Sequence, residues 1–158
     1  MKKLILLLAI VLSFSASAYA TKIKSTDLAV LVARAEYIVV GKVVKVDMID
    51  ANGHQVLDKK IKTGFRSGNT IRYYVDIDRK KTLKGNSKSI PRRLVLPDWN
   101  KWIRSLKGAE EDCGGQTCIF LLSGPNFSPA PPAEFMRDID EKKEIEKILK
   151  SQPRNIKP

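Results

Sequence analysis

The sequence predicts an α+β fold that is mainly β, a small Greek-key barrel with a short N-terminal helix, a short tryptophan-containing helical turn and a C-terminal helix. Three observations predict this class. Residues 69–78 alternate regularly between apolar and polar side chains, and two other stretches, residues 36–46 and 118–122, are dense in β-branched and apolar residues. Helical spacing of apolar residues occurs near both ends of the chain. Short strands with glycine-marked edges are typical of small barrels.

The first twenty residues are expected to be a secretory signal peptide. Two lysines precede an uninterrupted apolar run at residues 4–12, and the sequence AYA at residues 18–20 matches the small-x-small pattern of a cleavage site. The run is too short to span a bilayer stably, and the alternative is an uncleaved membrane anchor. We therefore expect a bacterial protein exported to the periplasm or the medium, beginning at Thr21 and without stable membrane insertion after cleavage.

The mature chain is expected to form one domain, residues 21–150, followed by a flexible tail at residues 151–158. A helix is predicted at residues 27–35, where Asp27 can cap the first turn. Residues 36–46 predict a strand in which Gly41 marks a bulge or a bend. Turn residues at 50–53 then begin a long loop or irregular hairpin.

The strand predicted at residues 69–78 has the clearest period in the chain. One face carries four apolar side chains, Ile71, Tyr73, Val75 and Ile77. Residues 79–85 are expected to extend this strand to a Gly-Asn turn, and a short strand follows at residues 94–96 between two prolines.

Asp98 can cap the expected helical turn, whose apolar stripe is Trp99, Trp102, Ile103 and Leu106. The acidic run at residues 110–112 is expected to be a solvated loop or a weak salt-bridge partner. A strand follows at 118–122, and the four prolines within residues 125–132 predict an extended segment. The last helix should begin at Asp138 in a capping-box arrangement.

Three segments together resemble the oligonucleotide/oligosaccharide-binding (OB) type barrel of the netrin-module and tissue-inhibitor-of-metalloproteinases superfamily: AEYIVVGKVVKV, IRYYVDIDRKKTLKG and CGGQTCIFLLSG. The resemblance implies an OB-like barrel over most of residues 28–124. Those inhibitors chelate the metal of their target protease through an N-terminal cysteine. The expected N-terminus here is Thr21, so that mechanism does not carry over, and a fold by itself does not define a function.

The two cysteines of the chain, Cys113 and Cys118, are expected to form a disulfide. Cysteines of exported proteins are usually oxidised, and Gly114 and Gly115 give the intervening loop the freedom that a small ring needs. A redox pair is the alternative, although catalytic dithiols favour two intervening residues rather than four. A zinc site is a third alternative, but two thiolates need two more ligands and the chain has one histidine, His54.

The positive charge is concentrated in one block. Without the two lysines of the signal peptide the chain has 27 basic and 17 acidic residues, and residues 59–107 hold 15 of the basic but only three of the acidic ones. Chance clustering on a solvated surface is one interpretation. The other is a positive face that attracts anions.

No set of residues in the sequence requires an enzyme, a metal or a cofactor, and His54 is expected to be a solvated loop residue. We therefore expect a non-enzymatic binding protein whose basic face docks an acidic protein of the envelope, as an inhibitor, immunity protein or adaptor would. The alternative is a binder of an anionic polymer, either an envelope polyanion or single-stranded nucleic acid. The candidate binding residues are Arg72, Lys80, Lys81, Lys84, Arg92, Arg93, Trp99, Lys101 and Arg104.

Overall fold

The computed structural model describes residues 26–64, 66–98, 103–131 and 133–152. The elements are α2 (Leu28–Arg34), β1 (Tyr37–Ile49), β2 (Thr70–Ile77), the 3-10 turn η1 (Arg79–Lys81), β3 (Arg93–Asp98), α3 (Leu106–Cys113), β4 (Thr117–Ser123), β5 (Ser128–Pro129), β6 (Met136–Asp138), the 3-10 turn η2 (Ile139–Glu141) and α4 (Lys142–Ser151). The predicted signal peptide and the tail beyond residue 152 lie outside the described residues.

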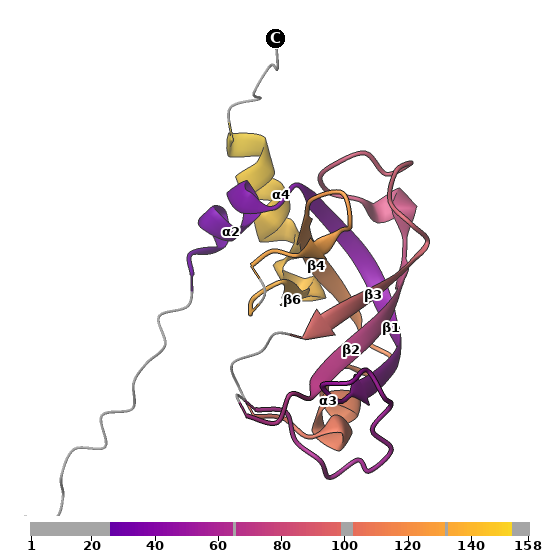
Figure 1. Cartoon of the computed structure of the whole chain (residues 1–158). Coiled ribbons are helices and arrows are strands. Elements are labelled where there is room, and N and C mark those ends of the chain that lie inside the picture. Colours follow the sequence, from indigo (N-terminus) through magenta and orange to yellow (C-terminus); the bar gives the residue numbers. More distant parts are fainter. Residues whose placement is uncertain (1–25, 65, 99–102, 132, 153–158) are drawn as a thin grey trace, which may run out of the picture.

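The strands form one six-stranded antiparallel sheet. Its order is β3-β2-β1-β4-β5, and β6 also pairs with β4. The long β1 lies in the middle of this order and curves through the sheet from the end of α2 (Figure 1). The predicted α+β class, mainly strand with helices at both ends, is therefore confirmed.

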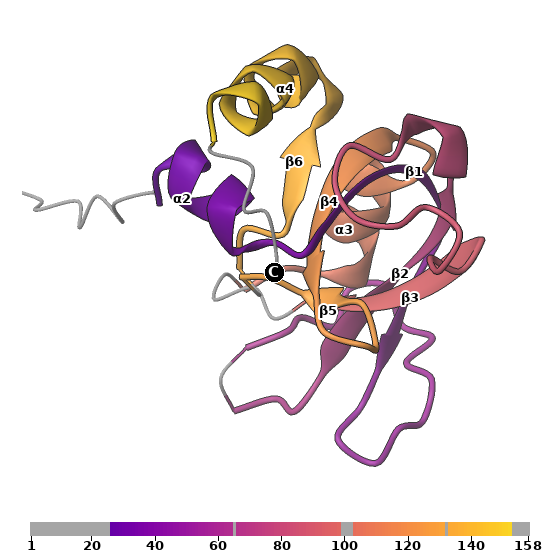
Figure 2. The same cartoon turned by 90° about the horizontal axis from the view of Figure 1, so that it is seen from above.

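The two central strands, β1 and β4, are covered on both faces. On one face α2 and α4 pack together, and both views show them beside each other at the same side of the sheet (Figures 1 and 2). This helical side buries Ile38 and Val40 of β1 with Ile119 and Leu121 of β4. The opposite face of the same strands buries the alternate residues in a larger cluster that includes α3. Burial on both faces explains why these strands are continuous apolar runs in the sequence.

Strand β2 has one buried and one solvent-facing side. Ile71, Tyr73 and Val75 are fully buried and Ile77 is nearly so, while every intervening residue is partly exposed. The alternation predicted for this strand is confirmed. Each such buried side chain contributes about 1.5–3 kcal/mol through the loss of apolar surface from water.

The predicted bulge in β1 is present, but not at Gly41. The register of β1 against β2 shifts between Val43 and Lys45. Gly41 itself is paired regularly with Ile77, and a Cβ at this position would lie 2.5 Å from Cγ1 of Val75. Glycine is needed there because the two backbones and a buried valine approach closely.

The predicted extension of β2 through residues 79–85 is wrong. The strand ends at Ile77, because the side chain of Asp78 accepts a hydrogen bond from the backbone N–H of Lys80 and starts η1. The chain then returns to the sheet, where Leu83 and Lys84 bond to the backbone of Ile38. A local cap thus competes successfully with continuation of the strand.

The helical turn predicted from Asp98 is also displaced. Residues 99–102 lie outside the described part, and Ile103 is non-helical and 68% exposed rather than part of a buried stripe. The helix is α3, which begins after Ser105, whose hydroxyl accepts from the N–H of Gly108. The acidic run expected to be a loop at residues 110–112 therefore lies within α3.

The C-terminal region differs from the prediction in two details. The proline-rich segment is not extended throughout, since residues 124–127 form a turn before β5. Asp138 does act as a cap, but for η2 rather than for α4, by accepting from the N–H of Asp140. Within the described residues, no helix has the length and apolar character needed to cross a membrane.

Candidate anion-binding site

An open pocket of about 720 Å³ lies where β2 ends and β3 begins. Its lining combines four cations, two carboxylates and one aliphatic side chain: Arg79, Lys80, Arg92, Arg93, Asp76, Asp78 and Ile77. Its four cations come from two short basic runs of the block, residues 79–81 and 92–93. The pocket is therefore a concave site that is lined by part of the predicted basic block.

Strand pairing and the η1 turn bring these residues together. Asp76 is paired with Arg93 across β2 and β3, and the backbone N–H of Ile77 donates to the carbonyl oxygen of Arg92 at 2.8 Å. The turn capped by Asp78 then directs the chain back so that Arg79 lines the same pocket. Residues 76–80 and residues 92–93 thus face one space because of the register of the β2–β3 pairing.

Both carboxylates of the pocket are already paired. Asp76 accepts two hydrogen bonds from Arg93, 2.6 Å from Nε and 3.2 Å from Nη2. Asp78 lies 3.1 Å from the ammonium group of Lys81. The hydrogen bond from Arg93 lowers the pKa of Asp76, and that from Lys81 lowers the pKa of Asp78. Both carboxylates are therefore anionic at neutral pH, and each is held in an ion pair.

Three cations of the pocket, Arg79, Lys80 and Arg92, form no ion pair with a carboxylate of the described residues, although the charge of Lys80 contributes to the lowered pKa of Asp78. Lys80 and Arg92 are exposed, whereas Arg79 is only partly so. The Nε atom of Arg79 is buried and has no hydrogen-bond partner within the described part of the chain. An N–H donor in this condition is costly unless an acceptor is supplied.

Two predicted binding residues have structural partners on the strands. Arg72 makes two hydrogen bonds of 2.8 Å to the buried carboxylate of Asp47, which also accepts from the hydroxyl of Tyr74 at 2.9 Å. Arg93 is held by Asp76 as described above. These guanidinium groups neutralise carboxylates of neighbouring strands, so they contribute little free charge to the surface.

Arg104 lies in a second internal network. Its guanidinium group contacts Asp112 of α3, Asp98 at the end of β3 and the hydroxyl of Tyr73, which in turn donates to Asp98 at 2.8 Å. The Arg104 side chain is 20% exposed. Burial, together with the nearby Asp98 and Cys113, raises the pKa of Tyr73, so its hydroxyl stays protonated. This network joins the core to α3.

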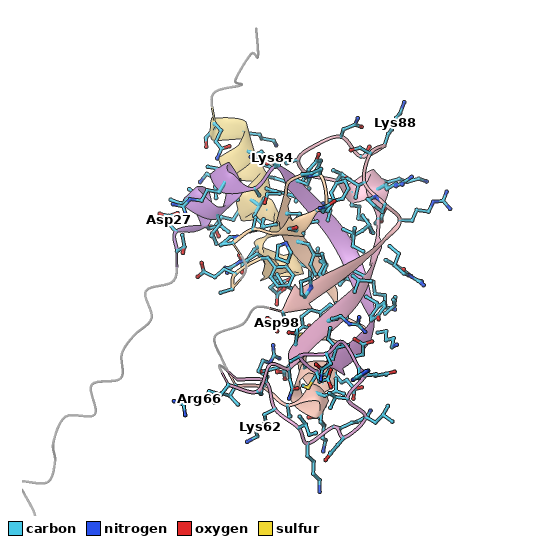
Figure 3. All side chains as sticks on the ribbon, in the orientation of Figure 1. Asp27, Lys62, Arg66, Lys84, Lys88 and Asp98 are labelled. Atoms are coloured by element: carbon cyan, nitrogen blue, oxygen red, sulfur yellow. The ribbon has the colours of Figure 1, made fainter. Side chains whose placement is uncertain are left out.

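Lys84 binds the end of a helix. Its ammonium group donates to the carbonyl oxygens of Val32 and Ala33 in the last turn of α2, at 2.9 and 3.2 Å, and Figure 3 shows Lys84 next to that helix. Burial lowers the pKa of Lys84. Lys81 pairs with Asp78, and the candidates Trp99 and Lys101 lie outside the described residues.

The basic block does not form a single face. Lys62 and Arg66 lie at the opposite end of the molecule from Lys88, although all three belong to residues 59–107 (Figure 3). The candidates from the sequence that the structure brings into one pocket are Lys80, Arg92 and Arg93. Arg79 was missed, and its position directly after a capping Asp at the strand end is the signal that could have identified it.

The expected disulfide is not present in the structure. Cys113 ends α3 and Cys118 lies near the start of β4, and both are free thiols buried in the same apolar cluster. Burial, the neighbouring Cys113 and Asp138 raise the pKa of Cys118 to about 11. A thiol with so high a pKa is a poor nucleophile near neutral pH, which does not favour the redox alternative.

His54 lies in the loop after β1, where its ring is 80% exposed and contacts Asp50. The described residues contain no group of three or more histidine, cysteine, aspartate or glutamate side chains arranged to hold a metal ion.

Comparison of the chain with known protein families, with curated proteins and with solved structures gave no significant match.

Proposed function

We propose that this chain is an exported, non-catalytic binding protein and that the surface around the pocket docks an acidic protein partner. The observation that carries the proposal is a set of three cations around one open pocket, Arg79, Lys80 and Arg92, which form no ion pair with the carboxylates that the structure describes. The fourth cation of the pocket, Arg93, is paired with Asp76, and elsewhere in the basic block Arg72 is paired with Asp47. Unpaired cations attract a negatively charged partner over long distances and speed its association.

The sheet supports a barrel of the OB type at the level of architecture. It is antiparallel, its central strand is long and strongly curved, and the register shift near Val44 supplies the local bend that closing a small sheet requires. We propose this barrel as the finer description of the fold. It brings no function with it.

The test of the docking function is capture of binding partners from an envelope extract at two salt concentrations. Arg92→Glu should reduce capture of an acidic protein and slow its association about tenfold, because the charge is reversed in the pocket. The matched control is Lys147→Glu, an exposed residue on α4 that makes the same charge change on another element. Equal loss in both variants would mean that only net charge matters.

The same experiment separates the alternative function. Binding of a nucleic acid or another anionic polymer should fall steeply and log-linearly with salt concentration. A protein interface with a buried centre is less sensitive. Recovery of polymer without an acidic protein would therefore replace the docking proposal by the polymer one.

A further inference from the structure

We infer that the docking surface has an apolar centre on the solvent-facing side of the sheet, formed by Val44, Tyr74 and Val95. Its occupant is an apolar side chain that the acidic partner carries between carboxylates. This inference rests on the proposed docking function, and it names the part of the partner that the surface recognises.

The register of the sheet gathers these side chains. Strands β1, β2 and β3 lie side by side (Figure 1). Tyr74 is paired with Lys45 on β1 and with Val95 on β3, so the three residues form one row across the strands. Val44 lies at the register shift directly before Lys45. Val95 is 47% exposed and Val44 is 44% exposed, so the apolar part of this row is open to a partner.

The side chains of Tyr74 and Val95 face each other at close range. The backbone N–H of Ile77 donates to the carbonyl oxygen of Arg92, so hydrogen-bonded positions of β2 and β3 recur every second residue from this pair. Tyr74 and Val95 are paired at a position between them, where facing side chains approach most closely. They therefore form one apolar surface, whereas hydrophobic residues exposed singly would need no explanation.

The row is continuous with the pocket. Asp76 and Arg93, which line the pocket, are the next pair on the same side of β2 and β3. Two residues along a strand span about 7 Å, so the row of Tyr74 and Val95 lies about that far from the rim of the pocket. An apolar centre beside a charged rim is the usual composition of a protein interface.

Two lysines give this side of the sheet an excess of positive charge. Lys42 and Lys45 of β1 are exposed, and Lys45 lies 3.5 Å from Asp47. The carboxylates of the same strand pairs, Asp47 and Asp76, are each already paired with an arginine. Carboxylates on either side of the incoming apolar side chain therefore complement this surface better than cations do.

The surroundings of Tyr74 favour a protein over a single-stranded nucleic acid. The Lys45 ammonium lies 4.8 Å from the centroid of the Tyr74 ring, and the guanidinium carbon of Arg72 lies 5.7 Å from it. The hydroxyl of Tyr74 donates to Asp47. A ring that already interacts with cations of its own chain is not a free platform for base stacking. Contact with the aliphatic Val44 and Val95 is the interaction that remains.

The direct test is NMR observation of the Val95 methyl signals in ¹³C-labelled protein. Two blocked peptides are the probes: one has a leucine between glutamates, and the other has a serine in its place. The leucine peptide should move the Val95 signals and saturate at a concentration about fivefold lower than the serine peptide, because leucine loses more apolar surface to the contact. Equal affinities, or Val95 signals that stay unmoved, would overturn the inference.

A matched pair of variants tests the position of the contact. Val95→Ser removes most of the apolar side chain and should abolish the preference for leucine, measured at the Val44 methyl signals. Val30→Ser is the control, because Val30 is 40% exposed but belongs to α2. It should keep the full preference. A preference that persists unchanged in Val95→Ser would mean that the leucine binds elsewhere and would contradict the assignment.

Other occupants have their own arms in the same experiment. A short oligothymidine and vesicles of phosphatidylglycerol are compared with the leucine peptide at equal ionic strength. Neither should move the Val95 signals as strongly as the peptide does. Stronger effects of the oligothymidine would replace the protein partner by a nucleic acid, and stronger effects of the vesicles would replace it by a membrane surface.

The two proposals can fail separately. If Arg92→Glu abolishes partner capture while the leucine peptide leaves the Val95 signals unmoved, docking stands and the apolar centre is wrong. If the peptide binds at Val95 with the expected preference but partner capture is unchanged in Arg92→Glu, the apolar centre stands and docking through the pocket is wrong.

Discussion

Arg72 and Asp47 face each other across the β1–β2 pairing and are joined by two hydrogen bonds of 2.8 Å each, from Nε to Oδ1 and from Nη2 to Oδ2. The Asp47 carboxylate is 4% exposed, and the hydroxyl of Tyr74 and the ammonium of Lys45 complete its surroundings. Arg72, which the sequence marks as a candidate for binding, therefore neutralises a buried carboxylate within the sheet.

Replacement of Arg72 by methionine should destabilise the fold by about 2–3 kcal/mol, because Asp47 would remain buried without its main counter-charge. Urea unfolding followed by circular dichroism measures the change. Arg93→Met is the control, since its pair with Asp76 is exposed and should matter much less. Equal effects of the two variants would contradict a special role for the buried pair.

The stability of the fold should depend on the charge of Asp47 at acidic pH. Burial by itself would raise the pKa of this carboxyl, but the hydrogen bonds from Arg72 and Tyr74 and the charges of Arg72 and Lys45 outweigh it and lower the net pKa. A depressed folded-state pKa adds stability above the unfolded value of about 3.9, and this is lost as pH falls through the folded value. The stability gap between the protein and Asp47→Asn should be constant near neutral pH and shrink below about pH 4.

Loss of the Lys84 ammonium should loosen α2. The two carbonyl oxygens that it binds belong to the last turn of the helix, where a cation also interacts favourably with the helix dipole. Lys84→Met should cost about 1 kcal/mol and raise the rate of amide exchange in α2 above that in β2. Lys81→Met is the control and should leave exchange in α2 unchanged, because the Lys81 ammonium pairs with Asp78.

The state of the two cysteines can be measured directly. If the chain is exported as predicted, protein recovered from the periplasm should carry one Cys113–Cys118 disulfide, with a non-reduced mass lower by two hydrogen atoms. A ring this small contributes roughly 2 kcal/mol, so reduction should lower the melting temperature without unfolding the domain. Two thiols that alkylate after denaturation of the non-reduced protein would instead show that the free-thiol state of the structure is the native one.

The predicted export has its own test. N-terminal sequencing of protein made in its native host should begin at Thr21, because cleavage is expected after Ala20. A chain that begins at Met1 would remove the oxidising compartment on which the disulfide prediction depends.

Local patterns in the sequence were sufficient to predict an element where its buried side chains recur with the period of a strand or a helix. The alternation of β2, the apolar run of β4 and the Asp27 cap of α2 were all predicted close to their observed bounds. Helix α3 was not predicted, because its eight residues contain Gly108 and three consecutive acidic residues. It forms because Ser105 caps it and because Leu106, Ala109 and Cys113 pack into the core, and that packing is not visible in local sequence.

The sequence by itself determined the fold class, the core faces of the strands and the concentration of positive charge in one block. Only the tertiary structure decided which of those charges are free. Antiparallel register places Asp47 opposite Arg72 and Asp76 opposite Arg93. The turn after β2 brings the Lys84 ammonium to the last turn of α2. Charge pairing depends on distances of a few ångströms between residues far apart in the chain. A count of charges along the sequence therefore cannot separate a paired arginine from Arg79, which has no ion-pair partner among the residues that the structure describes.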